Sequence, residues 1–191
     1  MTSFALAAVA LFLSAAPAPS AKVTANFPVP PKVEEQKFPF VSDATGGVEL
    51  TLTRQSLTSE DGTFILVSLP LLPLAQAAPV KSAKPEEQEP MVANAIVELQ
   101  KQVSERLVRS VSGKITDRKP VTLSVGKGTS LTGPTFDEGD QPNGSFIAHV
   151  VTSETPALYV VLAATRDDKV SKDKANEFVK SIAVPPTSGK R

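Results

Sequence analysis

The fold is decided by residues 91–113, MVANAIVELQKQVSERLVRSVSG. Apolar side chains recur there at spacings of three and four: Val92, Ile96, Leu99, Val103, Leu107 and Val111. This period predicts a helix over 91–112, about six turns long, with one apolar stripe. Glu105 and Arg109 lie off the stripe at the spacing of a favourable i,i+4 ion pair, so the charges of the segment indicate a solvated helix face. Gly113 predicts where the helix stops.

On both sides of this helix the apolar period falls to two or disappears. Val48, Leu50 and Leu52 alternate with polar residues, which predicts a strand with one buried face. The run 157–165 is apolar throughout and predicts a central strand, joined as a hairpin to 145–151. Further strands are expected at 63–69, 121–125 and 130–136.

A second helix is expected at 172–182, capped by Ser171. Its residues Ala175, Phe178, Val179 and Ile182 share one face. The predicted fold class is therefore α+β, an antiparallel sheet packed by the 91–112 helix and the 172–182 helix.

Residues 70–90 combine apolar side chains with a high density of proline. Prolines at this density predict a long loop rather than helix or central strand. Two interpretations of Leu71, Leu72 and Leu74 remain open. They fold back over one end of the core, or they form an exposed apolar surface for a partner or a lipid interface.

The first 21 residues have the pattern of a cleaved export signal. Phe4 to Ala16 is an apolar run too short to span a bilayer, and small residues follow it. Cleavage is expected after Ala21 or Ala25, and an uncleaved anchor is the rival interpretation because no Lys or Arg precedes the run. We therefore predict a secreted or periplasmic protein with an extended, Pro-rich segment at 22–47, the α+β domain at 48–186 and a disordered tail at 187–191.

The composition excludes several classes of site. There is no cysteine, so disulfides, thiolate metal sites and cysteine nucleophiles are absent. The 20 Lys and Arg residues balance the 20 Asp and Glu residues, which argues against nucleic acid as a partner. Tryptophan is also missing, which weakens the case for a carbohydrate module.

Every candidate reactive motif has a simpler structural explanation. His149 lies within a predicted strand, where a packed histidine is more common than a catalytic one. Ser124–Lys127 and Ser171–Lys174 both match S-x-x-K, but the companion motifs of penicillin-recognising enzymes are missing. Residues 126–129, GKGT, fit a hairpin turn better than a phosphate loop.

Two further motifs are weak for the same reason. Residues 137–140, DEGD, lack the spacing of a calcium loop. Asn143-Gly144-Ser145 is formally a glycosylation acceptor but is first a turn signal. No catalytic, metal or cofactor residue is assigned, and no cofactor is expected.

The order of elements resembles the PsbP-like family, named for an extrinsic subunit of photosystem II, with many small exported bacterial relatives of unassigned role. The resemblance is carried by Phe27-Pro28 after a strand, the long mid-chain helix, the apolar strand around Tyr159 and the final helix with Ala175, Phe178, Ser181 and Ile182. It implies an antiparallel sheet packed by helices. Its residues are packing residues, so it implies a fold rather than an activity.

The expected function is that of an exported, non-enzymatic binding or assembly protein of unassigned role, with an unknown envelope or extracellular protein as partner. Two alternatives stay open. One is a membrane-peripheral protein that uses the apolar 70–80 loop, and the other is a hydrolase with an unrecognised carboxylate or Ser-Lys site.

Overall fold

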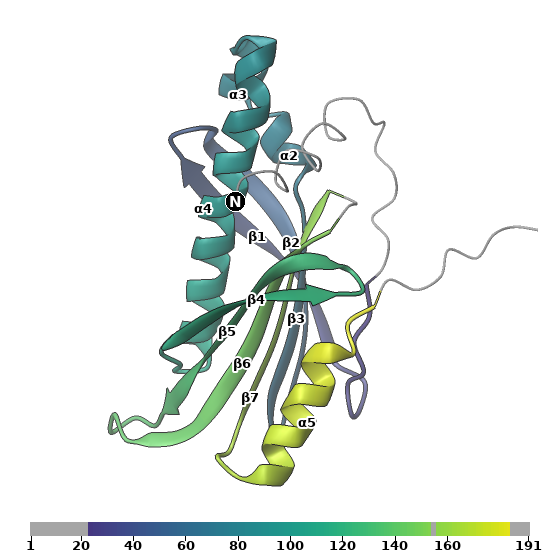
Figure 1. Ribbon diagram of the computed structural model, residues 1–191, viewed down its shortest axis with the longest axis vertical. Coiled ribbons are helices and arrows are strands. Elements are labelled where there is room, and N and C mark those ends of the chain that lie inside the picture. The colour runs from purple at the N-terminus through teal and green to yellow at the C-terminus, as the bar shows by residue number, and fades with distance from the viewer. Residues whose placement is uncertain (1–22, 154–155, 184–191) are drawn as a thin grey trace, which may run out of the picture.

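The computed structural model describes residues 23–153 and 156–183. It has an α+β fold built on a seven-stranded antiparallel sheet, with strand order β1-β2-β3-β7-β6-β5-β4 (Figure 1). The predicted fold class is confirmed. The predicted leader at 1–21 and the tail at 187–191 lie outside the described residues.

The strands are β1 (Lys32–Ser42), β2 (Gly46–Ser59), β3 (Gly62–Pro70), β4 (Asp117–Leu123), β5 (Gly126–Phe136), β6 (Pro142–Thr152) and β7 (Ala157–Thr165). The helices are α2 (Leu72–Ala75), α3 (Ala78–Ser82), α4 (Pro85–Ser110) and α5 (Lys169–Lys180).

Two meanders make up the sheet. Strands β1 to β3 are joined by hairpins, and so are β4 to β7. They meet where β3 pairs with β7, which sets Leu66 opposite Val161. Both of these strands are therefore central, as the apolar sequence of β7 predicts for that strand.

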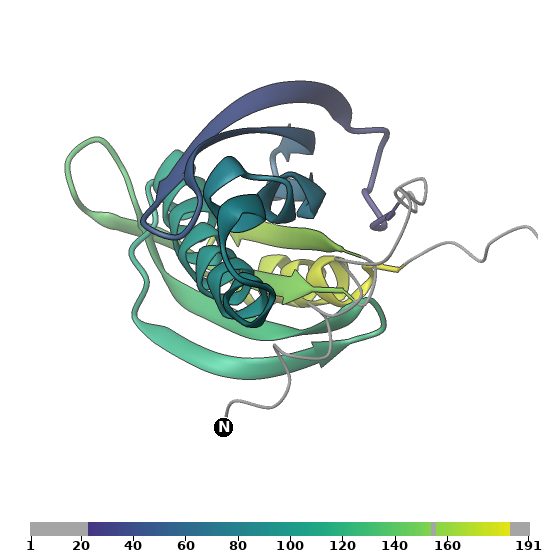
Figure 2. The same cartoon turned by 90° about the horizontal axis from the view of Figure 1, so that it is seen from above.

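The two long helices cover opposite faces of the sheet. Helix α4 packs with the side chains of one face in a cluster that includes Leu50, Ile65 and Leu162. Helix α5 packs on the other face, in a cluster with Phe64 and Tyr159. Figures 1 and 2 show α4 and α5 on the two sides of the strands.

Helix α4 is longer at its start than the apolar stripe predicts. It begins at Pro85 rather than at 91, and it ends at Ser110. Its stripe is confirmed, since Val92, Leu99 and Val103 are buried. Proline at the first helical position is favourable because the missing N–H has no partner there in any helix.

The prediction of a loop over 70–90 is wrong. The segment forms α2, α3 and the first turns of α4, and α2 and α3 also carry a proline in the first turn. Leu71 and Leu74 are fully buried in the α4-side cluster, while Leu72 is half-buried. The leucines therefore cover one end of the core, and Leu71 and Leu74 do not form an exposed contact surface.

The boundary of the domain at residue 48 is also wrong. The segment expected to be extended contains β1, an 11-residue strand paired with β2 along its whole length. Phe38 and Phe40 of β1 are buried in the α4-side cluster, so the edge strand belongs to the domain.

The start of the last helix differs from the prediction by a few residues. Asp168, not Ser171, is its N-cap, and its carboxylate accepts a 2.9 Å hydrogen bond from the backbone N–H of Ser171. This bond is the main reason that the pKa of Asp168 lies below its usual value. The predicted buried face of the helix is confirmed, with Ala175, Phe178 and Val179 all buried.

Candidate functional site

An open groove of about 490 Å³ lies between α5 and strands β5 and β6. Helix α5 contributes Lys172, Ala175 and Asn176 to one wall, and β5 contributes Thr132 and Pro134 to the other. The groove exists because α5 packs mainly over β7 and β6 and leaves the β5 end of this face uncovered. We call it the α5 groove.

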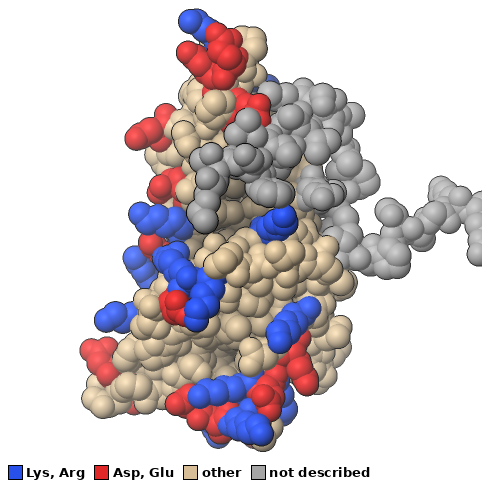
Figure 3. Space-filling model, viewed as in Figure 1, with Lys and Arg blue, Asp and Glu red and all other residues tan. Residues whose placement is uncertain are grey.

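The floor of the α5 groove is formed by β6, which contributes Ser145 and Ile147. The hydroxyl groups of Ser145 and Thr132 lie beside the apolar side chain of Ile147. This mixture suits a ligand with both amide and apolar groups. At the rim, Lys172 forms an ion pair with Asp167, so the positive charge of the lysine is balanced locally. Figure 3 shows charged side chains gathered along α4 and near the lower end of α5, with a largely uncharged surface between them.

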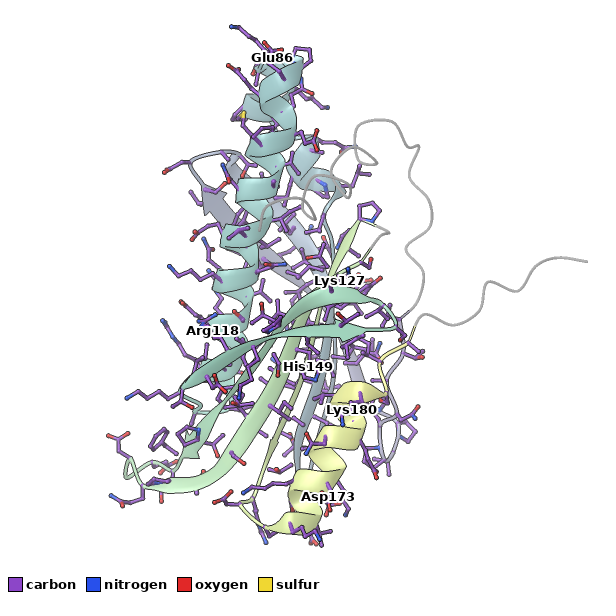
Figure 4. The ribbon with its side chains drawn as sticks, in the orientation of Figure 1. Glu86, Arg118, Lys127, His149, Asp173 and Lys180 are labelled. Atoms are coloured by element: carbon purple, nitrogen blue, oxygen red, sulfur yellow. The ribbon has the colours of Figure 1, made fainter. Side chains whose placement is uncertain are left out.

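His149 lies two residues beyond Ile147 on the same face of β6. It is 5% exposed, its Cα stands opposite Ser130 and Val161, and its Nδ1 has no hydrogen-bond partner among the described residues. Figure 4 shows it beside the last turn of α5, near Lys180. Burial is the main cause that lowers the pKa of His149, and the charge of Lys180 lowers it further.

The lowered pKa of His149 predicts a pH-dependent stability. The folded protein holds this histidine neutral, whereas the unfolded chain takes up a proton near pH 6.5, so the contribution is fully present above that pH and is lost as the pH falls below it. We expect the free energy of unfolding, measured with urea at about pH 7.5 and about pH 5.5, to fall more for the wild-type protein than for His149→Gln. Equal pH dependence of the two proteins would contradict a lowered pKa of His149 in the folded protein.

The S-x-x-K motifs do not form reactive pairs. Ser171 donates a 2.8 Å hydrogen bond to the Asp168 carboxylate, and Lys174 forms a 2.6 Å ion pair with Asp61. Ser124 is exposed and donates a 2.9 Å bond to the carbonyl oxygen of Ile182. Neither serine is therefore placed as a nucleophile beside a desolvated lysine, the arrangement that a Ser-Lys hydrolase requires.

The glycine-rich motif at 126–129 is part of a hairpin, as predicted. Gly126 pairs with Leu123, so residues 124 and 125 make the turn and GKGT begins β5. A phosphate loop would instead lead into the N-terminus of a helix.

The remaining motifs use their polar atoms locally. Oδ1 of Asp137 accepts bonds from the backbone N–H groups of Gly139 and Gln141, 2.9 Å each. Asn143 lies exposed in β6 rather than in a turn, and its Oδ1 accepts a 2.9 Å bond from Thr135. Within the ranges 23–153 and 156–183, no group of three or more acidic or histidine side chains could hold a metal ion.

Sequence reasoning did not find the residues of the α5 groove. Thr132, Ser145 and Asn176 come from three elements, and each is an ordinary polar residue in its own segment. The available signal was weak: polar residues 130 and 132 of β5 alternate with the buried Leu131, which marks a face that is not packed as core.

Comparison with known proteins adds little. No family model matches the chain, and no curated protein matches it. Among solved structures, the chain is similar to LpqN, a protein involved in cell envelope biogenesis of Mycobacterium tuberculosis, at 13% identity and a TM-score of 0.32, over 85% of this chain and 91% of that one. In the part of the chain that the structure describes, no helix has the length and apolar character needed to cross a membrane. A similarity at this level is a weak link to an envelope protein and identifies neither a family nor a function.

Proposed function

We propose that this chain is an exported, non-enzymatic binding or assembly protein of the PsbP-like kind, and that a partner protein binds in the α5 groove. The observation that carries the proposal is the groove itself. It is a preformed concave surface of about 490 Å³, lined by hydroxyl, amide and apolar groups. Such a lining favours binding, and no serine or histidine described above is arranged for bond cleavage.

Support for the PsbP-like assignment comes from contacts between distant parts of the chain. Phe27, from the early Phe-Pro, lies edge-on to Phe178 of α5, with ring centroids 4.9 Å apart. Tyr159 is buried in the same cluster as Phe178 and Ile182. Phe27, Tyr159 and Phe178 thus pack together on one face of the sheet, while the long mid-chain helix covers the other face.

The membrane-peripheral alternative and the Ser-Lys form of the hydrolase alternative lose the contacts that would favour them. A membrane-peripheral role needed the side chains of Leu71 and Leu74 on the surface, and both are buried. A Ser-Lys hydrolase needed a serine beside a lysine, whereas Ser171 and Lys174 each bind an aspartate instead.

Export is proposed from the sequence of the leader, and the contacts of residues 23–26 favour cleavage after Ala21. Val23 is 5% exposed, and Thr24 forms an antiparallel bridge with Ala183. The backbone N–H of Asn26 donates a 2.8 Å bond to the hydroxyl of Ser181. Cleavage after Ala25 would remove Val23, Thr24 and Ala25 from the fold.

A protein that starts at Asn26 is therefore expected to be less stable than one that starts at Lys22. The shorter form loses the burial of Val23 and the two backbone bonds between Thr24 and Ala183, 3.0 Å each. We expect it to lose about 2 kcal/mol of the free energy of unfolding in urea titrations. N-terminal sequencing of the exported protein gives the natural start, and a mature chain beginning at Asn26 would contradict the proposed cleavage after Ala21.

The binding proposal can be tested by site-specific photo-crosslinking in the producing cells. A photoreactive amino acid is placed at Thr132 or Asn176, on opposite walls of the α5 groove, and at Val97 of α4, which is 63% exposed, as the control. We expect the same partner to be captured from both groove positions and not from Val97. Asn176→Trp, which fills the groove, should abolish capture at Thr132. Equal capture at Val97, or capture that survives Asn176→Trp, would overturn the proposal.

A further inference from the structure

Strand β1 forms one edge of the sheet, and within residues 23–153 and 156–183 it pairs only with β2. Figure 2 shows its purple ribbon at the outer margin of the molecule. Strand β1 carries two exposed apolar side chains, Val33, which is 61% exposed, and Val41, which is 67% exposed. An open edge of this length presents unpaired backbone groups that can bind another strand.

A contact at the end of β1 shows which backbone groups face outward. The side chain of Gln102 of α4 donates a 3.2 Å hydrogen bond to the carbonyl oxygen of Val41, so this carbonyl points away from β2. Because N–H and C=O groups alternate in direction along a strand, those of Val33, Glu35 and Lys37 also point outward. The nitrogen of Pro39 also points outward. Its lack of an N–H therefore removes no hydrogen bond between β1 and β2.

We propose that a second copy of this chain binds here, its β1 antiparallel to the first with Gln36 on the two-fold axis, so that two sheets join into one. The argument rests on the charges of β1. With Gln36 on the axis, Glu35 of each copy lies opposite Lys37 of the other. Opposite charges in directly opposed positions stabilise a strand pair, and like charges destabilise it.

The neighbouring registers lack this complementarity. An axis at Glu35 sets two glutamates opposite each other, and an axis at Lys37 sets two lysines opposite each other. Glu35 forms no ion pair in the described part of the chain, and Lys37 forms a 2.9 Å pair with Glu49 while its side chain stays 66% exposed. The second copy thus supplies a lysine to the unpaired Glu35.

The rest of β1 fits the same register. Val33 lies opposite Pro39, so two apolar side chains meet on the face away from α4. On the α4 face, Glu34 lies opposite Phe38, whose ring carries the guanidinium of Arg106 at 4.4 Å. In this register β1 of the second copy begins with its Lys32 opposite Phe40 of the first. The pairing therefore ends before the Val41 carbonyl, which accepts the hydrogen bond from Gln102.

Charged residues and proline on an edge strand usually prevent indiscriminate pairing. Here the order of the charges also specifies one partner strand, which is β1 itself. This inference concerns a surface distinct from the α5 groove and does not depend on the proposed function.

The test is a charge exchange followed by sedimentation equilibrium of the purified protein. Wild-type protein is expected to be a dimer. Glu35→Lys and Lys37→Glu each replace two attractive pairs by two repulsive ones, and each should raise the dimer dissociation constant by about tenfold or more. The double variant should recover dimerisation. The two single variants, when mixed, should form a heterodimer because their charges are then complementary.

Lys119→Glu is the matched control, since Lys119 lies on the opposite edge strand, is 75% exposed and, like Lys37, forms an ion pair with an acidic residue, here Asp117. It should leave the dissociation constant unchanged. Circular dichroism establishes that each variant is folded. A monomeric wild-type protein, a dimer indifferent to both single changes, or single variants that do not associate with each other would overturn the proposal.

Discussion

Leu74→Ala is expected to lower the free energy of unfolding by about 2–5 kcal/mol. The side chain is fully buried in the α4-side cluster, together with Val80, Val92 and Leu99. Removing it leaves a cavity that the surrounding helices close only in part. Leu72→Ala is the matched control because Leu72 is half-buried in the same short helix, and it should cost about 1 kcal/mol.

Urea unfolding of the two variants measures this difference. It also separates the two interpretations of the 70–80 segment, because leucines on a contact surface would tolerate the change without loss of stability. If Leu74→Ala were as stable as the wild-type protein, the packing of α2 against α4 would be incorrect. A variant with serine at both Leu71 and Leu74 should not fold, so a loss of liposome binding in such a variant would not reveal a membrane surface.

Gly128→Ala is expected to cost about 3 kcal/mol or more. A Cβ at this position in β5 would lie 1.8 Å from the carbonyl oxygen of Val150, a backbone atom of the paired strand β6. Because this oxygen belongs to the sheet, it cannot move aside without separating β5 from β6. The α5 groove has β5 as one of its walls, so the change should also weaken binding there.

The control for Gly128→Ala is Gly47→Ala. A Cβ at Gly47 of β2 would meet no heavy atom within 4 Å, and this change should alter the stability by no more than about 0.5 kcal/mol. Thermal unfolding and binding of the crosslinked partner measure both effects. If the two variants were equally stable, the close pairing of β5 and β6 at Gly128 would be wrong.

The fold class followed from the sequence because its signals are local. The apolar stripe of α4 repeats within a few residues, and Val92, Leu99 and Val103 are buried as the period requires. The apolar run at 157–165 is a local signal of the same kind, since a strand buried on both faces needs apolar residues along its length.

The candidate site did not follow from the sequence because no motif encodes it. A search of the sequence for reactive groups selects His149, the serines of the two S-x-x-K motifs and the DEGD segment. The structure brings none of these residues together. The groove is formed by Thr132, Ser145 and Asn176. Its position depends on which part of the sheet α5 covers, and that is a property of the packed layers.

The sequence by itself determined the helix of residues 91–110, the central strands and the absence of thiol chemistry, because period and composition are properties of a single stretch of chain. Only the tertiary structure decided the role of the prolines at 73, 79 and 85. Proline disfavours the interior of a helix, although α4 accommodates Pro90 in its second turn. At the first turn proline is favourable, and packing there buries neighbouring side chains such as Leu71 and Leu74. Tertiary structure also decided that β3 pairs with β7, since about 90 residues separate them and no local pattern specifies a partner at that distance.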